Sequence, residues 1–137
     1  MSTTFVTASV CLLDGRRVAT VRKAGTHRFM LPGGKLEPQE TPLACAVREA
    51  HEEVGAALDP ADLAVLGHWV ADAANEPGAL VESTVHVCRA PAGLTPLAEI
   101  VELRWLAFDE PLPDDLGPLL SECVVPALRR HGRAERP

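Results

Sequence analysis

The sequence predicts an α/β protein in which a mixed β-sheet lies between helices. Three observations lead to this prediction: apolar and β-branched runs of strand length recur along the chain, one helical apolar repeat occupies residues 42–54, and another occupies residues 113–131. A chain of 137 residues is long enough to bury a substantial core. We therefore expect a single domain that spans residues 1–137.

The chain is expected to begin with a β-hairpin. Residues 4–13 are mostly apolar and β-branched, an Asp-Gly turn signal follows at 14–15, and residues 18–22 have the composition of a second short strand. A basic loop at residues 23–28 leads to the Pro-Gly-Gly sequence at 32–34. Glycines at this point allow the backbone to approach an ion or a phosphate closely.

The middle of the chain carries clear start and stop signals for a helix at residues 42–54. Thr41 is suited to cap the first turn, Pro42 is tolerated at the first helical position, and Gly55 is suited to end the helix. The apolar positions recur at helical spacing and predict the buried stripe. They are Leu43, Val47, Ala50 and Val54.

The second half of the chain is expected to form three strands and a terminal helix. Residues 63–74 and 79–90 are predicted to pair across a short turn, and residues 99–108 form the last predicted strand. Residues 113–131 have an amphipathic pattern and are predicted to cover the sheet as a helix. Pro126 falls inside this pattern and is expected to kink or break the helix.

Three carboxylates lie on one face of the central predicted helix. Glu49, Glu52 and Glu53 follow i, i+3, i+4 spacing, which brings their side chains together. Like charges at this spacing destabilise a helix by a few tenths of a kcal/mol each, and a hard divalent cation with a preference for oxygen ligands would offset that repulsion. By itself, such a triplet is also compatible with a solvated helix face.

The surroundings of these carboxylates resemble the 23-residue signature of the Nudix hydrolases. Gly34, Glu40 and residues 48–56 match that signature at every charged and glycine position. Ala50 and Ala56 depart from it, because a bulkier aliphatic residue is usual at both packing positions. The resemblance implies an α/β/α sandwich with a mixed sheet between helices, in agreement with the pattern of predicted elements.

The resemblance also implies roles for the residues of the motif. Glu49, Glu52 and Glu53 are expected to bind Mg²⁺ or Mn²⁺, with help from the Gly33 carbonyl. Arg48 is placed in the catalytic set as the residue that braces the carboxylates of Glu40 and Glu49. The supporting positions are Gly34, Glu40 and Gly55.

Two candidates for the general base stay open. Glu49 is one, and Glu99 is the other, because relatives use a glutamate shortly before a tryptophan of the last strand, which Trp105 marks here. Glu102 competes with Glu99 for this role. The candidate phosphate-binding residues are Arg22, Arg28 and Lys35, and Lys23 also lies in the basic loop.

The implied reaction is metal-dependent hydrolysis of a nucleoside diphosphate linked to another group. Relatives that act on dinucleoside polyphosphates carry a tyrosine well after the motif, and this chain has none. Ala71 and Asp72 stand where relatives that act on ADP-ribose usually have a proline. Both differences favour a nucleoside triphosphate or a related small nucleotide. A non-catalytic, nucleotide- or metabolite-binding regulator with the Nudix fold is the alternative. A pure cation-binding module would leave Gly33, Gly34 and Arg48 unexplained.

Composition limits the partners and the compartment. A net charge of −6 argues against binding of a nucleic acid polymer, and no apolar run is long enough to predict a membrane span. Four scattered cysteines without a C-x-x-C pair argue against a zinc site or a disulfide framework, so a reducing cytoplasm is expected. The sequence leaves the oligomeric state open, with a homodimer as the candidate assembly.

Overall fold

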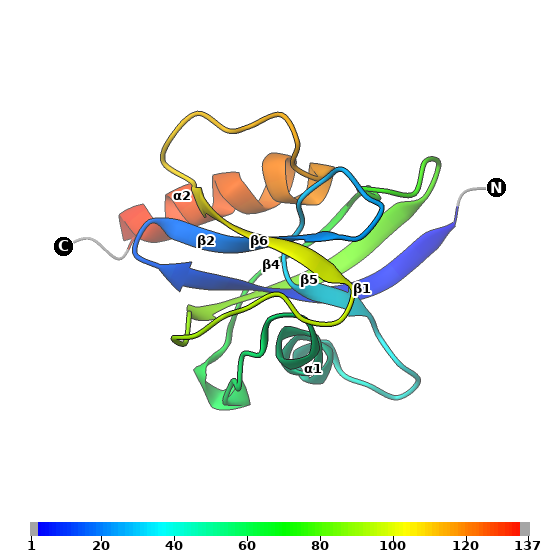
Figure 1. Ribbon diagram of the computed structural model, residues 1–137, viewed down its shortest axis with the longest axis horizontal. Helices are drawn as coiled ribbons and strands as arrows, with labels where there is room; N and C mark the ends of the chain where they lie inside the picture. The colour runs from blue at the N-terminus through cyan, green and yellow to red at the C-terminus, as the bar shows by residue number, and fades with distance from the viewer. Residues whose placement is uncertain (1–2, 135–137) are drawn as a thin grey trace.

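The computed structural model describes residues 3–134 and has a six-stranded sheet with a helix on each face (Figure 1). The predicted sandwich of a mixed sheet between helices is confirmed. No helix within the described residues is long and apolar enough to cross a membrane. The elements are β1 (Thr4–Asp14), β2 (Arg17–Lys23), β3 (Gly33–Lys35), α1 (Pro42–Val54), η1 (Pro60–Asp62), β4 (Ala64–Asp72), β5 (Leu80–Arg89), β6 (Ile100–Ala107), η2 (Leu119–Val124) and α2 (Val125–Ala134).

The strand order is β4-β5-β1-β2-β6, and β3 joins the sheet beside β1. β1 and β5 run parallel along their whole length, whereas the other strand pairs are antiparallel. The second edge of β1 is shared by two strands: β2 pairs with its end, and β3 pairs with Thr7, Ala8 and Ser9. This arrangement brings a short glycine-rich strand into the middle of the sheet.

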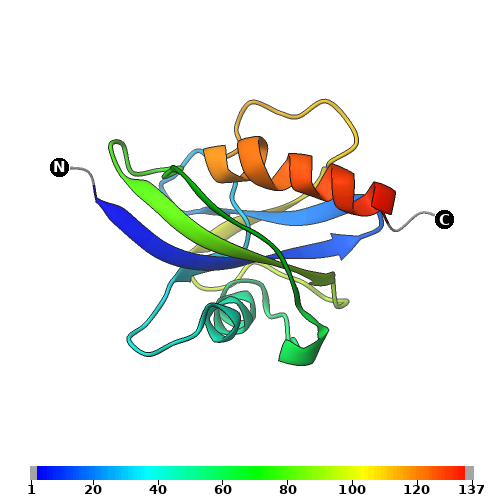
Figure 2. The same cartoon turned by 180° about the vertical axis from the view of Figure 1, so that it is seen from behind.

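Each face of the sheet has its own hydrophobic core. One core lies under α1 and includes Val10, Leu12 and Val21 with small residues of the helix. The other lies under the η2–α2 helix and includes Phe108 and Leu128. Successive residues of a strand point to opposite faces, so β1 contributes alternate side chains to the two cores. Figure 2 shows β1 and β5 extending beyond the first turn of the η2–α2 helix, which leaves part of this face without a helix above it.

Helix α1 has the boundaries expected from the sequence. The Thr41 hydroxyl accepts a hydrogen bond from the amide of Ala44 (3.1 Å), and Gly55 ends the helix with a left-handed φ of 72°. The predicted buried stripe is partly wrong, because Leu43 and Val47 are only half-buried. The helix packs instead through small residues, and the fully buried apolar ones are Cys45, Ala46, Ala50 and Val54.

Two further elements differ from the prediction. β3 falls on the Pro-Gly-Gly sequence, for which the sequence predicts no strand, but its backbone pairs with β1. The terminal helix starts near Pro118 and not at residue 113, and it passes Pro126 without a break. Wide π turns precede this proline, with the amide of Val125 bonded to the carbonyl of Leu120. Such turns change the bonding pattern at the point where the proline lacks an amide proton, which lets the helix continue.

Candidate active site

Strand β3 lies against the carboxylate face of α1, and Gly33 makes this possible. A Cβ atom at Gly33 would overlap the carbonyl oxygen of Ala8, so only glycine lets β3 approach β1 this closely. The Gly33 amide donates a hydrogen bond to Oε1 of Glu53 (2.9 Å). The pairing of two strands therefore fixes the position of a buried carboxylate on the helix.

Gly34 provides the space for the next carboxylate. A Cβ atom at this position would lie 2.6 Å from Oε1 of Glu49, well inside van der Waals contact. The same oxygen accepts a hydrogen bond from Nη1 of Arg48 (2.8 Å). The Glu49 carboxylate is thus held between the backbone of β3 and a guanidinium group.

Arg48 connects the carboxylates of the motif. Its Nε and Nη2 atoms donate to the two oxygens of Glu40 (2.7 and 2.8 Å), and Glu40 also accepts from the amide of Glu37 (3.0 Å). The hydrogen bonds from Arg48 are the main reason that the pKa of Glu40 falls to about 2. Arg48 also lies 3.4 Å from Glu52. These are the contacts that the sequence leads us to expect of a residue that holds carboxylate rotamers.

Burial raises the pKa of the carboxylates nearer the sheet, in contrast to the lowered pKa of Glu40. Glu53 is only 3% exposed, and desolvation raises its pKa to about 7, although the Gly33 amide and the charge of Lys23 act to lower it. Burial also raises the pKa of Glu49, against the effect of Arg48. Two neighbouring carboxyl groups therefore pay a desolvation penalty for ionisation that a nearby cation would reduce.

The donor set fits a hard divalent cation. Glu49, Glu52 and Glu53 provide only oxygen ligands, the type that Mg²⁺ and Mn²⁺ prefer. Within residues 3–134, no group of three or more His, Cys, Asp or Glu side chains is already arranged to hold an ion. Glu52 is half-exposed, and its carboxylate lies 3.4 Å from the Arg48 nitrogen that also donates to Glu49.

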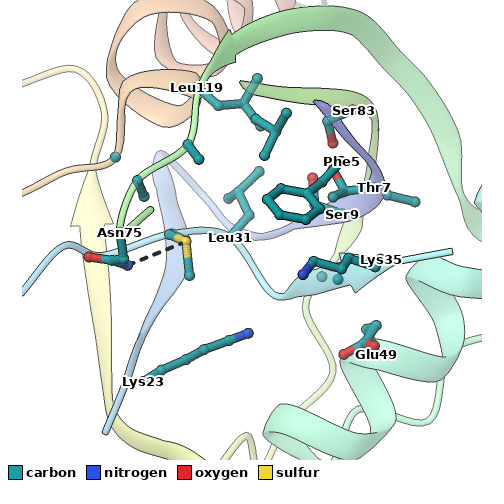
Figure 3. Close-up of a pocket in the computed structure, with 18 of the residues that line it drawn as sticks. Phe5, Thr7, Ser9, Lys23, Leu31, Lys35, Glu49, Asn75, Ser83 and Leu119 are labelled. Carbon is teal, nitrogen blue, oxygen red and sulfur yellow. Dashed lines mark hydrogen bonds between the residues drawn. The ribbon is translucent and has the colours of Figure 1, made fainter. Parts of the chain in front are cut away.

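A pocket of about 510 Å³ opens beside this carboxylate face (Figure 3). One end is charged and is lined by Lys23, Lys35, Arg48, Glu49 and Glu99. The other end lies on the part of the sheet that the η2–α2 helix leaves open, and its lining is mostly apolar with a few hydroxyl groups. This end includes Phe5, Thr7, Ser9, Ser83 and Leu119.

The structure separates the candidate substrate-binding residues. Lys35 lies in the pocket, with Nζ 3.8 Å from the centre of the Phe5 ring. Arg22 does not line the pocket and binds Glu102 and the Thr26 carbonyl. Arg28 also lies outside it and donates to the Leu116 carbonyl (3.0 Å).

The two candidate carboxylates Glu99 and Glu102 are separated in the same way. Glu99 lines the pocket and forms an ion pair with Lys23 (3.3 Å). Glu102 is absent from the lining and pairs with Arg22 across the β2–β6 ladder. Of the two, only Glu99 shares the pocket with Glu49.

Sequence reasoning missed the hydroxyl-bearing end of the pocket. Ser9 and Ser83 are 74 residues apart and meet only because β1 and β5 are parallel neighbours. The alternation of residues along β1 was the available signal, since Phe5, Thr7 and Ser9 occupy every second position and so lie on one face of the strand. Their shared face could have been inferred from it, but their neighbour on β5 could not.

The protein belongs to the Nudix family, because the NUDIX domain sequence model matches residues 3–126. The chain is similar to an RNA pyrophosphohydrolase of Halorhodospira halophila (strain DSM 244 / SL1), with 50% identity over 54 residues. That match covers 39% of this chain and 29% of the relative, so it spans less than a third of the relative's length.

Solved structures with the same fold share little sequence with this chain. The MutT NUDIX hydrolase from Burkholderia pseudomallei superposes with a TM-score of 0.74 at 22% identity, covering 93% of this chain and 98% of that one. A bifunctional NMN adenylyltransferase/ADP ribose pyrophosphatase from Francisella tularensis gives a TM-score of 0.68 at 18% identity, covering 95% of this chain and 42% of that one. At these identities the similarity establishes the fold.

Proposed function

We propose that this protein is a metal-dependent pyrophosphohydrolase that cleaves a nucleoside diphosphate linked to another group, with a nucleoside triphosphate or a related small nucleotide as substrate. The observation that carries the proposal is the polarity of the pocket. Its charged end combines Lys23 and Lys35 with the carboxylate face of α1, and its other end is mostly apolar. A nucleotide has the same two parts, a phosphate chain and an organic group.

In this proposal, Glu49, Glu52, Glu53 and the Gly33 carbonyl hold Mg²⁺ or Mn²⁺. The bound cation supplies neutralising charge for the phosphate oxygens and makes an attacking water more acidic. Lys23 and Lys35 bind the phosphate chain from the pocket side. Arg48 keeps Glu40 and Glu49 in position. Gly34 lets the backbone pass close to Glu49, and Gly55 lets the chain leave the helix.

We assign the general base to Glu99 in preference to Glu49. The Glu49 carboxylate is engaged by Arg48 and lies against Gly34, which suits a fixed ligand. The Glu99 side chain is 62% exposed, and Lys23 is its ion-pair partner within residues 3–134. The oxygen of water attacks phosphorus as its proton passes to Glu99, the phosphoanhydride P–O bond breaks, and the leaving phosphate departs with the bonding electrons.

The relatives support the reaction class more than the substrate. One relative is named an RNA pyrophosphohydrolase, and the Francisella structure is described as a complex with AMP and a manganese ion. The 54 matched residues cover only 39% of this chain. We favour a small nucleotide over an RNA end because the net charge of −6 opposes binding of a polyanion.

The proposal is tested by phosphate and pyrophosphate release from a panel of substrates. The panel contains nucleoside triphosphates, oxidised nucleotides, nucleotide sugars, dinucleotides and 5′-triphosphorylated RNA, each with millimolar Mg²⁺ or Mn²⁺ and with chelator. We expect metal-dependent release confined to the small nucleotides. Release from RNA alone would identify an RNA end, and not a small nucleotide, as the substrate. Binding without turnover of any compound would favour the regulator with a Nudix fold.

Gly34→Ala tests whether the position of Glu49 matters for this activity. The added methyl group would fall 2.6 Å from Oε1 of Glu49 and displace the carboxylate. We expect kcat/KM to fall by about tenfold or more, since small misplacements at a reacting centre have effects of this order. A melting temperature close to that of the wild type would show that the fold is intact, and unchanged turnover would remove Glu49 from the metal site.

A further inference from the structure

Two buried hydroxyl groups in the pocket lack hydrogen-bond partners. Ser9 is 6% exposed, Ser83 is 0% exposed, and both line the mostly apolar end of the pocket. Among the buried side-chain nitrogen and oxygen atoms of residues 3–134, their Oγ atoms are the two without a partner. Such groups are uncommon in folded proteins because burial removes water without replacing its hydrogen bonds.

Two other hydroxyl groups of residues 3–134 show how such groups are paired outside this pocket. The buried Thr20 hydroxyl donates to the Arg104 carbonyl (2.6 Å), and the Ser121 hydroxyl donates to the Gly117 carbonyl (3.3 Å). Alanine at positions 9 and 83 would avoid the desolvation penalty with little change in shape. The missing partners are therefore a particular property of this pocket.

The position of the two serines indicates what their partner would be. Ser9 on β1 and Ser83 on β5 lie on the sheet face that the η2–α2 helix leaves open, near the Phe5 ring (Figure 3). Phe5, Leu31 and Leu119 supply apolar walls around them. Both oxygens are shielded from bulk solvent, so only a group that enters the pocket and shifts its lining reaches them.

The charged end of the pocket fixes the orientation of the occupant. Lys35 Nζ lies over the Phe5 ring and so stands between the phosphate-binding end and the serines. A molecule whose phosphates contact Lys23 and Lys35 would place its organic group toward Ser9 and Ser83. A serine hydroxyl both donates and accepts hydrogen bonds, so the pair matches a planar ring with donors and acceptors along one edge.

We propose that Ser9 and Ser83 select the substrate by hydrogen bonding to the edge of its nucleobase. The inference rests on the proposed function and adds the residues that read the organic part of the substrate. A site with buried polar groups discriminates strongly, because a base that cannot pair with them leaves those groups unsatisfied.

Ser83→Ala and Ser9→Ala test this inference, with Ser121→Ala as the matched control outside the pocket. For the preferred nucleoside triphosphate, we expect each pocket variant to raise KM by about tenfold and to change kcat by less than about twofold. The ratio of kcat/KM for the preferred base to kcat/KM for the other bases is expected to fall. The melting temperature is expected to stay the same or to rise. Ser121→Ala is expected to leave the base preference unchanged.

A binding measurement separates this inference from the proposed function. Titration with the nucleoside monophosphates in chelator requires no catalysis, and we expect a base preference that Ser83→Ala weakens. If the wild type hydrolyses triphosphates and both pocket variants keep its base preference, the inference is overturned and the function stands. If hydrolysis is absent but the binding preference depends on Ser83, the function fails, and base reading by the serines is supported for a bound nucleotide in place of a substrate. An equal loss of affinity for every nucleoside monophosphate would show that the serines have only a structural role, and it would overturn the inference.

Discussion

Glu53→Gln is expected to lower metal-dependent turnover by at least about 100-fold and, at the same time, to stabilise the metal-free protein above neutral pH. The loss of turnover follows from the removal of a charged ligand beside Glu49. The gain in stability follows from the burial of Glu53, which is 3% exposed. Glutamine keeps the acceptor oxygen for the Gly33 amide and does not ionise.

The pH dependence of this gain follows from the pKa of Glu53, which is about 7 in the folded protein against an ordinary value of 4.5. A raised folded pKa means that the folded state binds the proton more tightly than the unfolded state. The stabilising contribution is therefore complete below about pH 4.5 and is lost as the pH rises through about 7. By about pH 8 the loss amounts to about 3 kcal/mol.

Urea unfolding in chelator at about pH 5 and about pH 8 measures this effect. The wild type is expected to lose stability between the two conditions, and Glu53→Gln is expected to lose less. Glu52→Gln is the matched control: its half-exposed carboxylate is proposed to bind metal, so turnover falls while stability changes by less than about 0.5 kcal/mol. Unchanged turnover in Glu53→Gln would remove Glu53 from the metal site, and an unchanged pH dependence would contradict its desolvation.

The parts of the site that depend on local spacing could be predicted from the sequence. The helix from Pro42 to Val54 has its own cap, first-turn proline and stop glycine, and all three act as expected. The contacts of Arg48 with Glu40 and Glu49, which the resemblance to the family signature implies, join residues of this helix and of the loop before it. Neighbours in sequence fix these interactions, so no knowledge of the sheet was needed.

Features that depend on distant strands could not be predicted in this way. The buried stripe of α1 shifts toward Cys45 and Ala46 because the sheet, and not the periodicity alone, decides which side packs. Arg22 is drawn to Glu102 by the register of β2 and β6, whereas its neighbour Lys23 enters the pocket. A change of one residue along a strand reverses the face to which a side chain points. The basic loop could therefore be located from the sequence, but which of its residues enter the pocket could not be predicted.

Glu99→Gln is expected to reduce kcat by more than about 100-fold while the affinity for Mn²⁺ stays the same. Glu99 lies in the pocket, its carbonyl accepts from the amide of Ala24 (2.9 Å), and its carboxylate pairs with Lys23. These contacts hold the carboxylate near the charged end. Glutamine preserves the hydrogen-bonding shape but cannot accept the proton of an attacking water, so the chemical step is affected and the fold is not.

Glu102→Gln is the matched control, because this carboxylate lies three residues further on and pairs with Arg22 outside the pocket. We expect it to change kcat by less than about twofold. Glu49→Gln should instead weaken Mn²⁺ binding, since Glu49 is proposed as a ligand. If Glu49→Gln lowered kcat at unchanged Mn²⁺ affinity while Glu99→Gln had no effect, Glu49 would be the base. The exposed Glu99 carboxylate would then serve only to orient Lys23 toward the phosphates.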